Sequence, residues 1–208
     1  MSTIIQGSPE WFEQRLGRVT ASRLVDVLAK VKSGEAAARA NYRAELVAER
    51  LTGKAAESFT NAAMKWGTDC EPLARAAYEA EFGVLVDEVG MIQHPSIEWA
   101  GASPDGLVGA DGLLEIKCPS TKTHIDTLLS GEAPSQYLPQ MFWQMACTGR
   151  AWCDFVSFDP RLPADMQMFV KRVHRDNDLI ARYEQEVIVF LSEVGDTILK
   201  LSQMRRAA

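Results

Sequence analysis

Two segments in the middle of the chain carry side chains that could perform chemistry together. They are Ser103-Pro104-Asp105-Gly106 and Leu114-Glu115-Ile116-Lys117. The second segment is predicted to be a strand, so Glu115 and Lys117 share one face while Leu114 and Ile116 point into the core. The proline and glycine of the first segment predict a turn that presents Asp105 beside that polar face.

Two carboxylates and a lysine that converge in this way suit hydrolysis of a phosphodiester. Asp105 and Glu115 offer the hard oxygen ligands that Mg²⁺ or Mn²⁺ prefers, and the carbonyl of Ile116 can add another. A metal held there lowers the pKa of a bound water and stabilises negative charge on the phosphate. Lys117 can orient or help deprotonate that water and adds positive charge beside the scissile phosphate.

Each segment also has an ordinary interpretation when it is taken alone. Pro-Asp-Gly is a common turn, and Glu-x-Lys on a strand is usually a solvated face. Together, closely spaced and in this order, they form a P-D…(E)-x-K pattern, which favours a metal-dependent nuclease.

The elements that must position these residues follow from helix caps and hydrophobic periodicity. Ser8-Pro9-Glu10 predicts a helix start, and Gly53 and Gly83 predict two helix ends. The expected fold is α/β (α+β mixed), one domain over residues 1–208 with helices flanking one small mixed sheet. Helices are expected over residues 9–17, 20–28, 36–51, 61–82 (with Gly67 and Pro72 as weak points), 121–129, 136–147 and 176–205, and strands over 84–86, 99–102, 113–117, 152–158 and 166–173.

Composition bounds the class of protein. The 208 residues are 47% hydrophobic and 24% charged, which is ordinary for a globular protein. The net charge of −6 argues against a protein that coats nucleic acid through bulk positive charge, but it does not exclude a DNA enzyme. Basic residues that could follow a DNA backbone, with no choice among them, are Arg18, Arg23, Lys30, Lys32 and Arg43.

The cysteines, histidines and N-terminus point to a reducing compartment. The four cysteines form no C-x-x-C pair, and the three histidines, His94, His124 and His174, are too widely spaced for a zinc site. Met1 to Gln6 lacks the features of a signal peptide, and no apolar run approaches the roughly 18 residues of a membrane span. We therefore expect a soluble protein of the cytoplasm with no membrane association.

Six blocks of residues, in order, resemble the lambda exonuclease (YqaJ-like recombinase) family of phage alkaline exonucleases, within the PD-(D/E)xK nucleases. The resemblance runs from about Ser8 to Arg161. The blocks are Trp11…Arg15-Leu16-Gly17 with Thr20-Ala21-Ser22, then Trp66-Gly67…Glu71, Ser103-Pro104-Asp105-Gly106, Leu114-Glu115-Ile116-Lys117-Cys118-Pro119, Tyr137…Gln140 and Phe158-Asp159-Pro160-Arg161.

The resemblance implies a restriction-endonuclease-like core and a Mg²⁺-dependent exonuclease of a phage or prophage in a bacterial cell. Such enzymes digest one strand of linear double-stranded DNA from the 5′ end and leave a 3′ overhang. The family's members assemble as homotrimer rings, and a single-strand annealing protein loads onto the overhang for DNA recombination.

The resemblance also assigns roles to individual residues. Asp105, Glu115 and Lys117 match the catalytic positions, Glu71 matches an acidic residue on a helix beside the metal, and Gln140 matches a helix glutamine near the active site. Without the resemblance, Glu71 and Gln140 would be interpreted as surface residues. Three residues match a group that binds the terminal 5′ phosphate: Arg15, Ser22 and Ser103.

Two residues of the expected DNA site stay open. The family pattern has an arginine after the catalytic lysine, where this chain has Lys122 and Thr123. Lys122 can supply the charge but not the bidentate geometry of an arginine, so dependence on a 5′ phosphate is less certain than metal-dependent cleavage. Trp11 could insert between bases or fasten its helix to the core.

Two other functions compete with the exonuclease. An endonuclease or nickase could use the same metal centre, and the local motif does not exclude it. A non-catalytic DNA-binding module would be free to lose any of Asp105, Glu115 and Lys117, so their joint presence argues against it.

Overall fold

The computed structural model describes residues 4–55 and 61–207, whose strands form two sheets instead of the single sheet expected. The larger sheet has the order β2-β5-β6-β7-β8, formed by β2 (Val86–Asp87), β5 (Gly106–Val108), β6 (Gly112–Lys117), β7 (Trp152–Phe158) and β8 (Met168–His174). The smaller sheet has the order β1-β4-β3, formed by β1 (Val19–Thr20), β4 (Ala100–Ala102) and β3 (Ile92–Gln93). The expected segment at 99–102 thus pairs with two strands of two residues, which are too short to show an alternating pattern.

The centre of the larger sheet is the parallel pair β6 and β7, which stay in register from Gly112↔Trp152 to Lys117↔Ser157. The connection between them contains α5 (Thr121–Ser130), the 3₁₀ turn η2 (Ser135–Tyr137) and α6 (Leu138–Thr148). The other pairs of this sheet are antiparallel, so the sheet is mixed, as expected.

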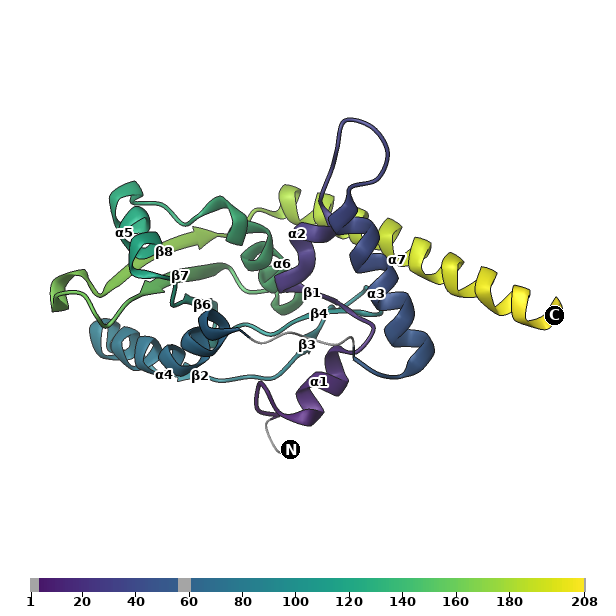
Figure 1. Ribbon diagram of the computed structural model, residues 1–208. Helices are drawn as coiled ribbons and strands as arrows, with labels where there is room; N and C mark the ends of the chain where they lie inside the picture. Colours follow the sequence, from purple (N-terminus) through teal and green to yellow (C-terminus); the bar gives the residue numbers. More distant parts are fainter. Residues whose placement is uncertain (1–3, 56–60, 208) are drawn as a thin grey trace.

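Strand β6 lies between two helical layers, and its side chains alternate between them. Leu113 belongs to the hydrophobic cluster that contains Met141 and Met145 of α6. Leu114 and Ile116 belong to the other cluster, with Ala74 and Tyr78 of α4 (Ala62–Phe82). Figure 1 shows α4 and α6 on either side of the strands. The predicted inward direction of Leu114 and Ile116 is confirmed.

Helix caps set most helix boundaries near their predicted places. Ser8 Oγ accepts from the backbone N–H of Trp11 at the start of α1 (Pro9–Arg15). Gly53 and Gly83 adopt left-handed φ angles after α3 (Ala37–Thr52) and α4. Helix α4 nevertheless continues through Gly67 and Pro72, because its buried face packs along the larger sheet.

The segment after Thr20 differs from its prediction. In place of one helix over residues 20–28, it forms the 3₁₀ turn η1 (Ala21–Arg23) and the short α2 (Leu24–Val27). Thr20 belongs to β1 and its side chain caps nothing. Its backbone N–H donates to Tyr42 Oη at 3.2 Å, which ties this segment to α3.

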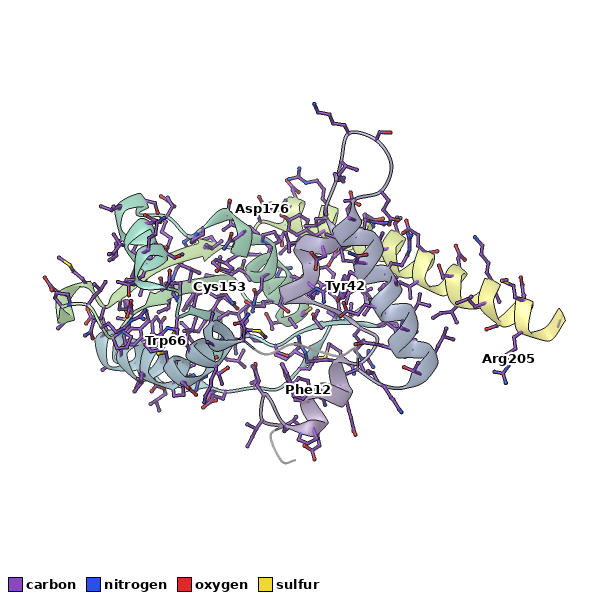
Figure 2. The ribbon with its side chains drawn as sticks, viewed as in Figure 1. Phe12, Tyr42, Trp66, Cys153, Asp176 and Arg205 are labelled. Carbon is purple, nitrogen blue, oxygen red and sulfur yellow. The ribbon has the colours of Figure 1, made fainter. Side chains whose placement is uncertain are left out.

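The last helix, α7 (Asn177–Ala207), packs against α3 and α6 and then extends beyond the rest of the molecule (Figure 1). Figure 2 places Arg205 near the far tip of this extension and Tyr42 within the body. The buried His94 lies 3.2 Å from Glu184 of α7 and stacks on Trp143 of α6. His94 therefore helps to fix α7, in agreement with a structural role.

The described part of the chain contains no helix that is long and apolar enough to cross a membrane. The start of the chain, Met1 to Thr3, on which the expected absence of a signal peptide partly depends, lies outside the described residues.

Candidate active site

Asp105 is held directly against β6. It lies at the bend that leads into β5, its backbone N–H donates to the carbonyl of Leu114 at 3.1 Å, and its Oδ2 accepts from the N–H of Ile116 at 2.6 Å. Gly106 starts β5 and does not complete a turn. A Cβ atom there would lie 2.0 Å from Cγ1 of Val86, so the close approach of β2 requires a glycine.

Glu115 points to the predicted face of β6, but that face is covered and the side chain is fully buried. Its Oε1 accepts from Gln140 Nε2 at 2.6 Å and from Lys117 Nζ at 2.5 Å, and its Oε2 accepts from Gln144 Nε2 at 2.5 Å. A carboxylate has about four lone-pair sites, so these three donors leave one site open. The helix α6 thus satisfies a charge that would be costly to bury alone.

Lys117 completes the predicted trio. Its ammonium contacts Glu115 and lies 5.2 Å from the centre of the Tyr137 ring. Burial lowers the pKa of Lys117, but the charges of Glu115 and Asp105 outweigh this, so that its pKa lies above the ordinary value. A lysine that keeps its proton orients ligands and stabilises negative charge, and this favours those roles over that of a base.

Glu71 faces the same site from α4, as the family resemblance implied. Its Oε1 accepts from Arg75 Nη2 at 2.7 Å. Arg75 also contacts Glu88 at 2.8 Å and donates to the carbonyl of Asp105 at 3.3 Å. Arg75 therefore connects the helix carboxylate to the strand that carries Asp105.

Sequence reasoning missed Gln144 and Arg75. Each lies four residues after a residue that was identified, Gln140 and Glu71, and residues four apart share a helix face. That spacing is the signal that could have found them.

Glu71, Asp105 and Lys117 line a cavity of about 490 Å³, which we call the carboxylate cavity. Burial and the charge of Glu115 raise the pKa of Asp105 well above its ordinary value. Burial raises the pKa of Glu71 as well, and the charge of Glu115 adds to this effect. The lining residues are Asn61, Ala63, Met64, Gly67, Glu71, Asp105, Ile116, Lys117, Cys118, Pro119 and Tyr137.

The donor set of this cavity fits a hard divalent cation. Within residues 4–55 and 61–207, no three His, Cys, Asp or Glu side chains form a ready-made metal cluster. Asp105, Glu71 and Ile116 nevertheless line one cavity, and Glu115 contacts Lys117, which lines the same cavity. Carboxylate and carbonyl oxygens are the ligands that Mg²⁺ and Mn²⁺ prefer. A cation there would favour the charged forms of Asp105 and Glu71, whose pKa values are raised by burial and by the charge of Glu115.

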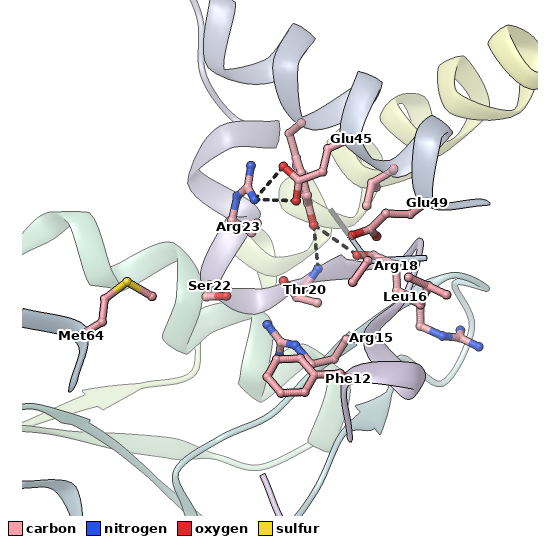
Figure 3. A pocket seen from close by; sticks show the side chains of 13 residues that line it. Phe12, Arg15, Leu16, Arg18, Thr20, Ser22, Arg23, Glu45, Glu49 and Met64 are labelled. Atoms are coloured by element: carbon pink, nitrogen blue, oxygen red, sulfur yellow. Dashed lines mark hydrogen bonds and ion pairs between the residues drawn. The ribbon is translucent and has the colours of Figure 1, made fainter. Parts of the chain in front are cut away.

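A second cavity, of about 430 Å³, lies between α1, η1 and α3; we call it the arginine cavity. Figure 3 shows Phe12 and Arg15 of α1 facing the segment with Thr20 and Ser22. The lining residues are Phe12, Arg15, Leu16, Arg18, Thr20, Ser22, Arg23, Tyr42, Glu45, Leu46, Glu49, Ala55 and Met64.

Three predicted phosphate-binding residues, Arg15, Ser22 and Ser103, lie in or next to this cavity. Arg15 and Ser22 both line it, and Arg15 Nη1 donates to Ser103 Oγ at 3.4 Å. Trp11 Nε1 also donates to Ser103 Oγ, at 3.0 Å, and the Arg15 guanidinium lies 4.1 Å from the centre of the Trp11 ring. These contacts favour Trp11 as the residue that fastens α1 and orients Arg15.

The two cavities are neighbours. Met64 lines both, and Ser103 lies two residues before Asp105. A third cavity, of about 300 Å³, shares Ser22 with the arginine cavity and Tyr137 with the carboxylate cavity, and Gln140 lines it too. A nucleotide end could therefore reach both sets of residues.

Lys122 lies elsewhere. It is exposed on α5 and lines neither the carboxylate cavity nor the arginine cavity. Several basic residues considered for a DNA path are instead neutralised by acids: Arg23 by Asp26 and Glu45, Lys30 by Glu186, and Arg43 by Glu35 and Glu193.

The sequence blocks around Trp66 and Asp159-Pro160-Arg161 contact each other and stabilise the position of α4. The Arg161 guanidinium lies 4.2 Å from the centre of the Trp66 ring and makes a bidentate ion pair with the buried Asp159. This contact joins the start of α4 to the end of β7, so it holds the helix that carries Glu71.

The fold, a small mixed sheet flanked by helices, is restriction-endonuclease-like. Residues 10–151 match the YqaJ-like viral recombinase domain, and the chain belongs to that family. A comparison with curated protein sequences gives no match.

Solved structures agree with this assignment. The alkaline exonuclease LHK-Exo from Laribacter hongkongensis is 54% identical, with a TM-score of 0.89 over 96% of this chain and 99% of that one. LHK-Exo in complex with dAMP has the same identity and coverage and a TM-score of 0.91. A phage-related exonuclease from Haemophilus somnus 129PT shares the fold at 16% identity, with a TM-score of 0.69 over 88% of this chain and 96% of that one.

Proposed function

We propose that this protein is a Mg²⁺-dependent exonuclease that digests one strand of linear double-stranded DNA in the 5′-to-3′ direction. The observation that carries the proposal is the contact of Arg15 and Trp11 with Ser103, two residues from Asp105. This contact brings residues suited to a terminal phosphate near the carboxylates and the lysine, and so supports the proposal. The likeness to an alkaline exonuclease at 54% identity supports the same activity.

Each residue has a role that follows from its contacts. Asp105, Glu115, Glu71 and the carbonyl of Ile116 would hold the Mg²⁺, with Mn²⁺ as a substitute. The bound cation supplies a water of lowered pKa and positive charge at the scissile phosphate. Gln140 and Gln144 fix the orientation of Glu115, and Lys117 places its ammonium beside the phosphate.

The direction of digestion would come from the arginine cavity. Arg15, Ser22 and Ser103 are suited to a terminal 5′ phosphate, because a guanidinium and hydroxyls donate several hydrogen bonds to its oxygens. Holding that terminus places the first phosphodiester at the neighbouring carboxylate cavity. The digested strand is then removed from its 5′ end, and the other strand remains as a 3′ overhang.

The biological setting belongs to the same proposal. A homotrimer ring would keep the enzyme on the duplex, and a single-strand annealing protein would take over the overhang for phage recombination in the bacterial cytoplasm. The family to which the chain belongs, the viral recombinases, supports this setting.

The test uses end-labelled linear duplex and a closed circular duplex, each with Mg²⁺, Mn²⁺ or EDTA. We expect loss of the 5′ label from linear DNA only with metal, an intact circle, and no digestion by Lys117→Ala or Glu115→Gln. Cutting of the circle would instead identify an endonuclease or nickase with the same metal centre. No cutting with either metal would leave a non-catalytic DNA-binding module.

A further inference from the structure

The arginines from α1 to the end of α3 fall into two groups. Arg23, Arg39 and Arg43 each make ion pairs with glutamates. Within residues 4–55 and 61–207, Arg15, Arg18 and Arg50 make no ion pair with a carboxylate. Arg15 has the role proposed above, which leaves Arg18 and Arg50 as cations without a function.

Arg18 and Arg50 come together at one aromatic ring. Their guanidinium carbons lie 5.0 Å and 4.3 Å from the centre of the Trp99 ring. Arg50 Nε donates to the carbonyl of Gly17 at 2.8 Å, whereas its Nη2 is buried and has no hydrogen-bond partner in the described part of the chain. Burial lowers the pKa of Arg50, and the positive charge of Arg18 lowers it further, with a partial offset from Glu98. An anion bound there would reduce the repulsion between the guanidinium groups of Arg18 and Arg50.

Trp99 itself is held in an unusual conformation. Its φ is +64°, and among the described residues it is the only residue other than glycine with a positive φ. The carbonyl of Trp99 accepts from the N–H of Val19 at 2.8 Å, and Val19 pairs with Ala100 in the smaller sheet. This pairing holds a bulky residue in a strained conformation, 36% exposed, beside the segment that carries Arg18. Strain of this kind gathers at binding sites.

We propose that Arg18, Trp99 and Arg50 form a second phosphate-binding site, which holds an internal phosphodiester of the DNA while Arg15 holds the terminal phosphate. This inference rests on the proposed function. Arg18 also lines the arginine cavity, so the second site is continuous with the first. Stacking on Trp99 orients a guanidinium and leaves its N–H groups to donate to phosphate oxygens.

The test measures DNA affinity in the Lys117→Ala background, so that no substrate is consumed. Arg18→Gln, Arg50→Lys and the double variant are compared by fluorescence anisotropy with a labelled, 5′-phosphorylated duplex over a range of salt concentrations. Arg43→Gln is the matched control, because Glu35 and Glu193 already neutralise Arg43. Thermal unfolding of each variant shows that it is folded.

We expect Arg18→Gln to weaken binding about 3- to 10-fold at moderate salt and to reduce the slope of log K against log salt by about 1. Arg50→Lys keeps the charge but loses the planar guanidinium, so its affinity should fall with little change in slope. Affinities and slopes equal to those of the Arg43→Gln control would overturn the proposal.

A second substrate separates the two phosphate sites. A 5′-phosphorylated mononucleotide, used as a competitor, carries a terminal phosphate but no internal phosphodiester, so it can test the terminal-phosphate site alone. Its affinity should fall with Arg15→Lys and stay unchanged with Arg18→Gln. Equal losses for both variants would place Arg18 in the terminal-phosphate site and overturn the inference, although metal-dependent digestion by the protein with Lys117 intact would still support the proposed function.

Discussion

The carboxylate cavity and the arginine cavity are neighbours, and they contain buried groups of opposite charge. In the first, burial and then the charge of Glu115 raise the pKa values of Asp105 and Glu71. In the second, burial lowers the pKa of Arg15, which makes no ion pair within the described residues. One cavity is short of a cation and the other is short of an anion, and a metal ion with a phosphate ester would satisfy both.

The two cavities also differ in how firmly their side chains are held. Among the described residues, Glu115 accepts from three donors at 2.5–2.6 Å, whereas Arg15 has one hydrogen bond of 3.4 Å and a stacking contact with Trp11. A fixed carboxylate suits the chemical step, and an adaptable arginine suits the capture of a DNA end. Substitutions in the first cavity should therefore lower kcat, and those in the second should raise KM.

The largest effect is expected in the carboxylate cavity. Lys117→Ala and Glu115→Gln should each reduce the rate of digestion by about a thousandfold, because both remove charge at the scissile phosphate. Single-turnover digestion of linear duplex with Mg²⁺ measures this loss, with Lys171→Ala as a control lysine on β8. A loss of less than tenfold in Lys117→Ala would contradict its role.

Arg15→Lys should have the next largest effect and should act on binding. We expect KM for a 5′-phosphorylated end to rise about 10- to 100-fold, since a lysine keeps the charge but loses bidentate geometry. The preference for a 5′-phosphate over a 5′-hydroxyl end should fall with it. Arg43→Lys is the matched control, and an unchanged preference in Arg15→Lys would argue against the arginine cavity as the phosphate site.

A substitution of Gln144 tests whether its hydrogen bond orients the carboxylate of Glu115. Gln144→Leu removes the donor to Glu115 Oε2 and should lower kcat about tenfold with little change in KM, since one hydrogen bond to a buried charge is lost. Because the loss should fall on kcat and not on KM, it separates a positioning role from a general loss of the site. An unchanged kcat, or an equal change in KM, would contradict that role.

Metal-free stability should reflect the crowded carboxylates. The raised pKa of Asp105 means that the folded protein binds a proton in a pH range where the unfolded chain does not, so stability falls as pH rises through that range. Asp105→Asn should flatten this fall and raise Tm at neutral pH in EDTA by about 2–4 °C. Mg²⁺ should stabilise the wild type and not the variant. Equal Mg²⁺ stabilisation of both proteins would show that the cation binds elsewhere.

The smallest effect is expected from Lys122. Because it is exposed on α5 and lines neither cavity, Lys122→Ala should change the preference for a 5′ phosphate by no more than about threefold, through long-range attraction alone. A loss as large as that of Arg15→Lys would mean that α5 approaches the DNA end and would restore Lys122 as a direct phosphate ligand.

The residues of the site could be predicted where local rules apply. Strand alternation placed Glu115 and Lys117 on one face, and the family resemblance identified Glu71, Gln140 and the group around Arg15. The contacts of Gln144 and Arg75 depend on how helices pack across the sheet, which no local pattern specifies. The pattern also could not show that Glu115 is fully buried, because a charged residue is expected in solvent unless its partners are known.

The fold was predictable to a similar extent. Helices with caps and long strands were found near their true bounds, such as α4 and β7. The second sheet was missed because β1 and β3 have two residues each, and the role of Gly106 was misjudged because a close approach to Val86 leaves no local signal.

The central claim is that a metal ion binds in the carboxylate cavity and a terminal phosphate in the arginine cavity. A crystal structure of Lys117→Ala with Mn²⁺ and a 5′-phosphorylated oligonucleotide tests it directly through the anomalous signal of the metal. We expect a manganese peak bounded by Asp105, Glu115 and the carbonyl of Ile116, with the terminal phosphate on Arg15, Ser22 and Ser103. Manganese outside this cavity, or a terminal phosphate away from Arg15, would contradict it.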